Sequence, residues 1–144
     1  MSSKTTTAER RPVPVRRGSK ALITAGDRLL LVKERHADGT SFWTLPGGGV
    51  EPAESMEAAL RRELAEELRC RATVEEQLAT FWYSHTSVDK LSFCTVFECS
   101  LLTPATPNPV EGVFERRWLR PGELPPSTLL QVRHLVEGWS DRMR

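Results

Sequence analysis

The sequence predicts an α/β or α+β sandwich, in which helices pack against a sheet. The chain has 144 residues, 39% hydrophobic and 27% charged, which is the composition of an ordinary globular domain. A domain of this length buries about 70% of the surface that its unfolded chain exposes, enough for a core without disulfides. Strand-like segments rich in β-branched and aromatic residues flank two segments with helical periodicity, and this mixture predicts the sandwich.

The charge of the chain is nearly balanced but unevenly distributed. The formal net charge of +1 excludes a uniformly basic surface, so nucleic acid is not an expected partner. Residues 1–18 carry a net charge of +4 and few large apolar side chains, which predicts a flexible basic tail. Val13 and Val15 could extend along the body, and the tail could also serve as a weak phosphate-binding arm. Residues 19–144 carry −3 and are expected to form a single domain.

The cysteines and the apolar runs indicate the compartment. Cys70, Cys94 and Cys99 have neither the number nor the spacing of a disulfide framework or a zinc site, so we expect reduced, buried thiols. The N-terminus lacks the apolar segment of a signal peptide. The longest aliphatic run, residues 29–32, is far too short to cross a membrane. A soluble cytoplasmic protein without a membrane partner is expected.

The first third of the chain predicts a hairpin followed by a short strand. Residues 20–25 and 29–33 are apolar runs separated by Gly26-Asp27-Arg28, a sequence typical of a hairpin turn. A second turn is predicted at Asp38-Gly39-Thr40. The segment 42–45 is expected to be extended, because Pro46 disfavours helix at the residue before it.

The strongest helix prediction spans residues 55–68. Pro52 precedes it, Ser55 can accept from the first free amides, and the acidic Glu54 and Glu57 complement the positive helix end. The run Gly47-Gly48-Gly49 before it permits unusual backbone angles.

The second half of the chain predicts three strands, a loop and a terminal helix. The strands are expected at 73–82, 91–101 and 115–119. The proline-rich segment 103–109 predicts a surface loop. Residues 127–141 show helical periodicity and are expected to form the terminal helix.

The predicted helix at 55–68 carries three acidic residues on one face. At 100° per residue, Glu63, Glu66 and Glu67 share an arc of about 100°. Like charges at these spacings destabilise a helix by a few tenths of a kcal/mol per pair. A solvated acidic face and a divalent-metal site both fit the helix alone. The adjacent glycine run favours phosphoryl chemistry, because such loops approach phosphates closely and Mg²⁺ bridges carboxylates to phosphates. The neighbouring apolar row places the carboxylates at the edge of the buried face; it consists of Leu60, Leu64 and Leu68.

The segment from Gly48 to Cys70 resembles the Nudix box, the signature of the Nudix hydrolase family, with the pattern G-x5-E-x7-R-E-U-x-E-E-x-G-U, where U is a bulky aliphatic residue. Arg69 stands where the family has glycine, and Cys70 where it has a bulky aliphatic residue. A left-handed backbone at Arg69 would cost about 1–2 kcal/mol, unless the helix runs on or ends differently. The matching residues are Gly48, Glu54, Arg62, Glu63, Leu64, Glu66 and Glu67.

The resemblance implies a fold, a reaction and a metal. The fold is a Nudix-type α/β/α sandwich with a mixed sheet between helices. The reaction is hydrolysis of a nucleoside diphosphate linked to another moiety, with Mg²⁺ or Mn²⁺. Glu54 and Arg62 would form a salt bridge that positions the carboxylates. The implied metal ligands are Glu63, Glu66 and Glu67, with the carbonyl of Gly47 or Gly48.

The resemblance leaves the general base and the substrate contacts open. The base is a box glutamate or a loop glutamate, with Glu111 the first candidate and Glu115 the second; both could equally be surface acids. Lys33, Arg35 and His36 follow a predicted strand and could meet phosphates or remain surface charges. Aromatic side chains that could stack a base, or belong to the core, are Trp43, Phe81, Trp82 and Tyr83.

The leading substrate is a (d)NTP or a related small nucleotide. The proline typical of the ADP-ribose subgroup is absent from residues 83–88, and Tyr83 gives only weak support for a dinucleoside polyphosphate. Alternatives are ADP-ribose or a nucleotide sugar, a dinucleoside polyphosphate, RNA 5′-end processing, and a non-catalytic nucleotide-binding domain. Homodimers are frequent in the family.

Overall fold

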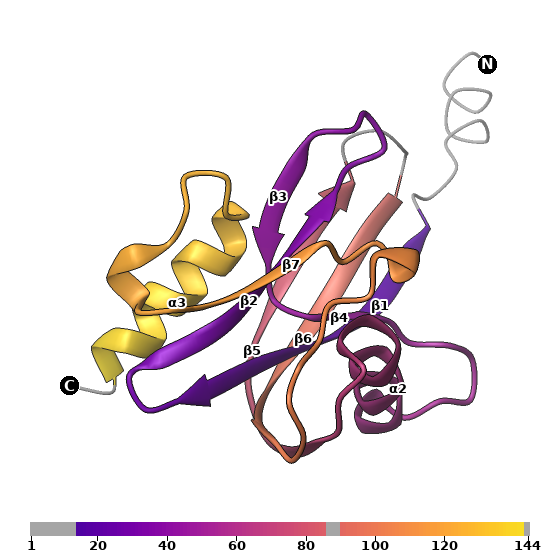
Figure 1. The fold of residues 1–144 in the computed structure, drawn as a ribbon. Coiled ribbons are helices and arrows are strands. Elements are labelled where there is room, and N and C mark those ends of the chain that lie inside the picture. Colours follow the sequence, from indigo (N-terminus) through magenta and orange to yellow (C-terminus); the bar gives the residue numbers. More distant parts are fainter. Residues whose placement is uncertain (1–13, 86–89, 143–144) are drawn as a thin grey trace.

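A computed structural model of the chain describes residues 14–85 and 90–142 and confirms the α+β sandwich with a mixed sheet (Figure 1). The path of paired strands is β3-β2-β1-β6-β5, with β4 on β1 and β7 on β2. The β1–β6 pair is parallel and the other pairs are antiparallel. The strands are β1 (Val15–Ala25), β2 (Arg28–Arg35), β3 (Ser41–Thr44), β4 (Gly47–Gly49), β5 (Ala72–His85), β6 (Lys90–Leu101) and β7 (Glu115–Leu119); the helices are α2 (Met56–Leu68) and α3 (Leu130–Arg142), with short 3₁₀ helices η1 (Pro109–Glu111) and η2 (Pro121–Glu123).

Most predicted elements are present, but several boundaries differ and the glycine run forms a strand, β4, that was not predicted. The β1–β2 hairpin and the turn at 38–40 are as predicted, and the loop predicted at 103–109 ends at residue 108, because Pro109 begins η1. β1 begins at Val15, so residues 15–18 belong to the sheet and not to the tail. Residues 1–13 of the predicted tail lie outside the described residues. The terminal helix begins at Leu130, because the preceding segment pairs with β3: the Trp43 amide donates to Ser127 O, at 3.1 Å, and the Leu129 amide to Trp43 O, at 2.9 Å.

One helix packs on each face of the sheet, and the central strands β1, β2 and β6 supply buried residues to both core clusters (Figure 1). Successive residues of β2 alternate between two core clusters: Leu29 and Leu31 face α3, while Leu30 and Val32 face α2. Full burial of one such side chain contributes about 1.5–3 kcal/mol. The helical residues that fill the two clusters are Leu60, Leu64 and Leu68 of α2 and Val132, Val136 and Trp139 of α3.

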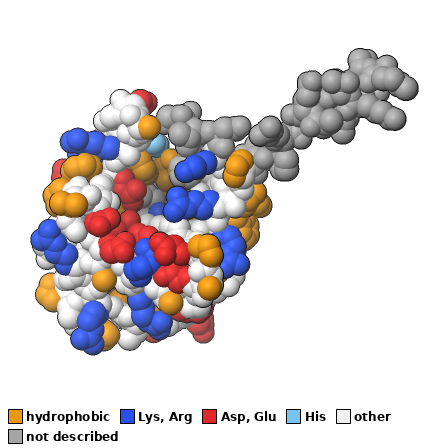
Figure 2. All heavy atoms as spheres, turned by 90° about the vertical axis from the view of Figure 1, so that its right-hand side faces the viewer, with side chains coloured by type: hydrophobic (Ala, Val, Ile, Leu, Met, Phe, Trp, Pro, Cys, Tyr) orange, Lys and Arg blue, Asp and Glu red, His pale blue; other side chains and the backbone are white. Residues whose placement is uncertain are grey.

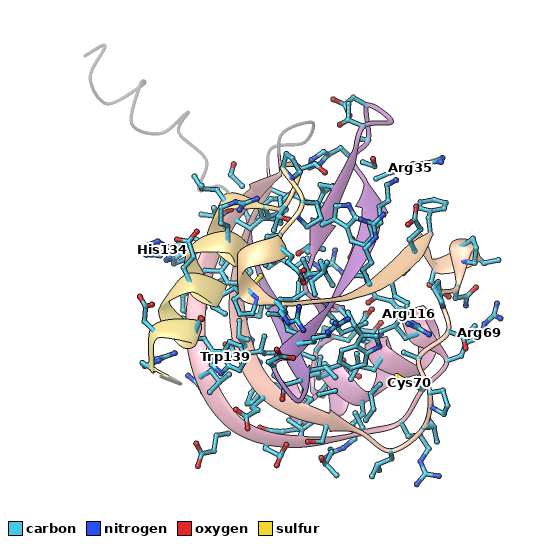
Figure 3. The ribbon with its side chains drawn as sticks, turned by 60° about the vertical axis from the view of Figure 1, so that its left-hand side comes forward. Arg35, Arg69, Cys70, Arg116, His134 and Trp139 are labelled. Carbon is cyan, nitrogen blue, oxygen red and sulfur yellow. The ribbon has the colours of Figure 1, made fainter. Side chains whose placement is uncertain are left out.

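Side chains of the two helices and the cysteines follow this layering. Trp139 turns from α3 towards the sheet, whereas His134 points away from it (Figure 3). The three cysteines are free and buried, as predicted, and burial raises the pKa of each thiol, that of Cys99 to about 12. No helix in the described part of the chain is long and apolar enough to cross a membrane.

Candidate active site

The site forms where the glycine strand β4 meets the C-terminal half of α2 and the first part of β1. Ser55 caps α2, since its side chain accepts from the Ala58 amide at 3.1 Å. The Ser19 hydroxyl of β1 donates to Met56 O at 2.9 Å and ties the helix start to the sheet. The box residues therefore lie on a helix that is fixed at its first turn.

Arg62 is the centre of a network that joins the loop before α2 to the helix. Its Nε and Nη2 donate to the two carboxylate oxygens of Glu54, at 2.8 and 2.9 Å, which is the implied salt bridge. Nη2 also donates to Gly49 O at 3.0 Å. Nη1 donates to Glu63 at 2.9 Å and to Glu66 at 3.4 Å. The Arg62 hydrogen bonds lower the pKa of Glu54 to about 2.

Glu67 is the most deeply buried of the box glutamates. Its side chain is turned to β4, where Oε1 accepts from the Gly47 amide at 2.9 Å. Burial raises the pKa of Glu67 to about 8, although Lys20 opposes the shift. Lys20 Nζ donates to Gly47 O at 3.1 Å, so the carbonyl and amide of one glycine face the lysine and the glutamate. Gly47 has φ 132°, and a Cβ there would collide with the backbone of β1.

Glu63 and Glu66 complete the acidic cluster at different depths. The Glu63 carboxylate lies so close to Gly48 that a Cβ there would be 2.5–2.8 Å from its atoms, which explains the glycine at this position. Glu66 is more open, with 40% of its side chain exposed. Carboxylate and carbonyl oxygens are the hard donors that Mg²⁺ prefers. Within residues 14–85 and 90–142, no group of three acidic, histidine or cysteine side chains has the arrangement of a metal site. Two of the carboxylates, those of Glu63 and Glu66, accept hydrogen bonds from Arg62, and that of Glu67 accepts one from the Gly47 amide.

A pocket of about 350 Å³ opens beside these groups, and acidic and basic side chains crowd around the hollow (Figure 2). Arg35, His36 and Tyr83, named from the sequence as substrate contacts, line it, as does Phe81. His36 stacks on Phe42, with ring centroids 4.1 Å apart. The other charged lining residues are Arg16, Arg17, Lys20, Glu34, Glu63 and Glu67.

Two residues predicted to contact substrate lie elsewhere. Trp43 is only 4% exposed and belongs to the core cluster under α3, because it alternates with Phe42 and Thr44, which face the pocket. Lys33 lies 6.0 Å from the Trp43 ring and pairs with Glu115 at 3.4 Å. Of the other stacking candidates, Trp82 is 52% exposed and is not among the pocket-lining residues.

The loop glutamates do not line the pocket. Glu111 is exposed on η1, an element that contacts α2, and Glu115 is paired with Lys33 and Arg117. The structure thus brings Glu63 and Glu67 to the pocket and leaves Glu66, like both loop candidates, outside its lining.

The end of α2 shows how the chain manages without the family glycine. Arg69 adopts the left-handed conformation, φ 49° and ψ 39°, and its amide donates to Leu64 O. Asn108 clamps the same helix end, since its side-chain amide donates to Glu66 O at 2.8 Å and its backbone amide to Glu67 O at 2.9 Å. The Arg69 guanidinium, at the outer surface beside this loop, donates to Asn108 Oδ1 at 3.2 Å (Figure 3).

Several residues of the site were not predicted from the sequence. Lys20 begins the apolar run 20–25, Glu34 follows the run 29–33 between Lys33 and Arg35, and Arg16 and Arg17 were assigned to the tail. A charged residue beside an apolar strand segment was the available signal for Lys20, because such residues are seldom buried without a partner. Glu34 gave no such signal, because it stands between the charged residues Lys33 and Arg35. Asn108 gave no comparable signal.

The sequence of this chain matches a known family model and known proteins. The family model described as NUDIX domain matches residues 14–137. The CTP pyrophosphohydrolase of Escherichia coli strain K12 is 46% identical over 62 residues, 42% of this chain and 46% of that protein. The NAD-capped RNA hydrolase NudC of Pseudomonas syringae pv. syringae strain B728a is 28% identical over 122 residues, 82% of this chain and 41% of that protein. The chain spans less than half the length of these two curated relatives.

Solved structures agree on the fold. The MutT NUDIX hydrolase from Burkholderia pseudomallei superposes with a TM-score of 0.77 at 24% identity, covering 86% of this chain and 97% of that one. The E. coli ORF135 protein has the same TM-score at 22% identity, covering 91% and 92%. With the family model covering most of the chain, from β1 into α3, and with Gly48, Glu63 and Glu67 of the box lining one pocket, this protein belongs to the NUDIX domain family.

Proposed function

We propose that the protein is a Mg²⁺-dependent pyrophosphohydrolase of small nucleotides, with a (d)NTP as the leading substrate and Mn²⁺ as a possible substitute metal. The observation that carries the proposal is the convergence of Glu63, Glu67 and the glycine strand on one wall of a pocket whose other walls are basic and aromatic. Phosphates suit the basic wall and a base suits the aromatic wall.

The chain supplies a defined set of groups for this reaction. Glu63, Glu66 and Glu67, with a carbonyl of Gly47 or Gly48, would hold the metal, which when bound stabilises charge on the phosphate oxygens. Arg62 sets the positions of Glu63 and Glu66 and neutralises part of their charge.

The site also offers a proton acceptor for the attacking water. Glu66 is the best placed box glutamate, because its side chain is the most open and its contact with Arg62, at 3.4 Å, is the longest in the network. Glu111 remains the loop alternative; neither it nor Glu66 is among the pocket-lining residues.

The test uses conservative variants and a nucleotide panel with MgCl₂. Glu66→Gln and Glu67→Gln are expected to lose most of the pyrophosphate release, whereas Glu57→Gln, on the exposed first turn of the same helix, should retain it. Near wild-type hydrolysis by both of the first two variants would show that the assignment is wrong. Replacing Glu111 by Gln in the same assay separates the two candidate bases.

The products identify the substrate class. An NTP should give a nucleoside monophosphate and pyrophosphate, and CTP comes first in the panel because a relative is named for it. ADP-ribose or a nucleotide sugar would instead give a nucleoside monophosphate and a sugar phosphate. A dinucleoside polyphosphate and NAD-capped RNA complete the panel, the latter because of the relative NudC. Tight nucleotide binding without any turnover would identify a non-catalytic domain.

The proposed setting is the cytoplasm, with a small nucleotide as the partner and without nucleic acid or membrane. A homodimer is part of this proposal, and light scattering after size exclusion tests it.

A further inference from the structure

A carboxylate lies inside the pocket without an assigned role. Glu34 belongs to β2, two residues after Val32, and so shares the strand face that turns towards α2. Its Oε2 is buried and has no hydrogen-bond partner among the described residues. A buried polar atom left unpaired costs about 1–3 kcal/mol, so the group needs an explanation.

The surroundings of Glu34 are those of a base-binding wall. Phe42 lies directly opposite Glu34 in the β2–β3 pairing, and His36 directly follows the last residue of β2. These two rings stack on each other beside the carboxylate, and all three residues line the pocket. A flat aromatic surface next to a hydrogen-bond acceptor matches a nucleobase, which stacks by its face and hydrogen-bonds by its edge.

The phosphates cannot satisfy Glu34. Phosphate oxygens only accept hydrogen bonds at neutral pH, and their charge repels a carboxylate. The cations of the pocket, among them Arg35 and Lys20, suit the phosphates. Lys20 also attracts the Glu34 carboxylate through its charge, but its Nζ donates to Gly47 O, and Glu34 Oε2 receives no hydrogen bond from the described residues. What the buried oxygen lacks is a donor from the nucleoside part of the ligand.

We propose that Glu34 is a specificity-determining residue that accepts a hydrogen bond from the exocyclic amino group of a nucleobase. This inference rests on the proposed function and extends it to a substrate class, the amino-bearing bases. A keto oxygen in the place of the amino group would face the carboxylate as a second acceptor, so the pocket disfavours uracil against cytosine.

The experiment compares wild type with Glu34→Gln, which keeps the shape, and with Glu137→Gln on the exposed face of α3 as the matched control. In wild type and control, kcat/KM for CTP is expected to exceed that for UTP by about tenfold or more, the usual discrimination of one good base contact. In Glu34→Gln the ratio should fall below about threefold, through KM rather than kcat, because the amide offers donor and acceptor alike. ATP against ITP is the purine version of the same comparison.

Three results would overturn the proposal: an equal loss on all nucleotides, an unchanged CTP/UTP ratio, or a tenfold change in the Mg²⁺ concentration that half-saturates the reaction. The first indicates a structural role and the last a metal ligand. A CTP/dCTP ratio that changes while the CTP/UTP ratio stays constant indicates a sugar contact and refutes the base contact.

A binding arm separates this inference from the proposed function. Calorimetry with CMP and UMP in EDTA measures base discrimination without turnover, and CMP should bind about tenfold more tightly than UMP to wild type but not to Glu34→Gln. If this holds while no nucleotide is hydrolysed, the inference stands and the hydrolase proposal fails. If hydrolysis occurs but the two monophosphates bind equally, the base contact is refuted.

Discussion

Arg69 ends α2 in the left-handed conformation, and replacing it tests how the chain tolerates a side chain where the family has glycine. Two substitutions are needed, Arg69→Gly and Arg69→Ala. Both remove the guanidinium and its hydrogen bond to Asn108 Oδ1, so the difference between them isolates the backbone.

The magnitude follows from opposing effects. A residue with a Cβ in this conformation destabilises the folded state by about 1–2 kcal/mol, whereas glycine adopts the conformation without this cost. Glycine in turn gives the unfolded chain more freedom, worth about 0.4–1 kcal/mol. The free energy of unfolding of Arg69→Gly should therefore exceed that of Arg69→Ala by about 0.5–1 kcal/mol, or roughly 2–4 °C in Tm.

The assay is urea and thermal denaturation of the two variants, read by circular dichroism. An alanine variant as stable as the glycine variant would refute the argument from backbone strain. Turnover should stay nearly unchanged in Arg69→Gly, because Asn108 still holds the carbonyls of Glu66 and Glu67. A large rise in kcat would show that Arg69 distorts the site.

Two further outcomes follow from the charges of the site. The pKa of Glu54 lies at about 2, below the ordinary 4.5, so its ion pair with Arg62 stabilises the fold above pH 4.5 and this contribution is lost as the pH falls towards 2. In Glu54→Gln the Tm should therefore fall less steeply between pH 4.5 and 2 than in wild type. Equal slopes of Tm against pH in the two proteins would contradict this. Millimolar Mg²⁺ should raise the Tm of wild type, because binding to the native state adds about 2.7 kcal/mol to the free energy of unfolding at 100 times Kd. The Tm of a Glu66→Gln, Glu67→Gln double variant should not change with Mg²⁺, and an unchanged wild-type curve would count against a metal site.

The local elements could be predicted because their signals are local. The turn at Gly26 and the cap at Ser55 set boundaries within a few residues of chain, and both hold in the structure. The start of α3 could not be placed in the same way. Residues 127–129 have helical periodicity, but their backbone groups bond to Trp43, far away in sequence, and this pairing replaces the first helical turn.

The site shows the same contrast between features set by local sequence, which could be predicted, and features set by packing between distant residues, which could not. The box glutamates and Arg62 are fixed by spacing along one helix, and the Glu54–Arg62 pair is present. The faces of the strands are not fixed in this way, because alternation tells which residues share a face but not which face is the pocket. Phe42 and Trp43 are equally plausible aromatic contacts in sequence, and only the packing of α3 on Trp43 assigns them.

Arg62 explains how Glu63 and Glu66 can share one helix turn next to a glycine strand, while the third glutamate, Glu67, accepts from the Gly47 amide. Their repulsion was expected to be offset by Arg61, Arg62 or a bound cation, and the structure assigns the contacts to Arg62, whose hydrogen bonds reach Glu54, Gly49, Glu63 and Glu66. Guanidinium is the side-chain group that offers five donors in one plane, so it can hold the loop with one edge and the helix with the other. Two of those contacts involve proposed metal ligands and the others do not. A cation that binds Glu63 and Glu66 would therefore compete with Arg62 for these carboxylates while the bidentate pair with Glu54 keeps the loop in place.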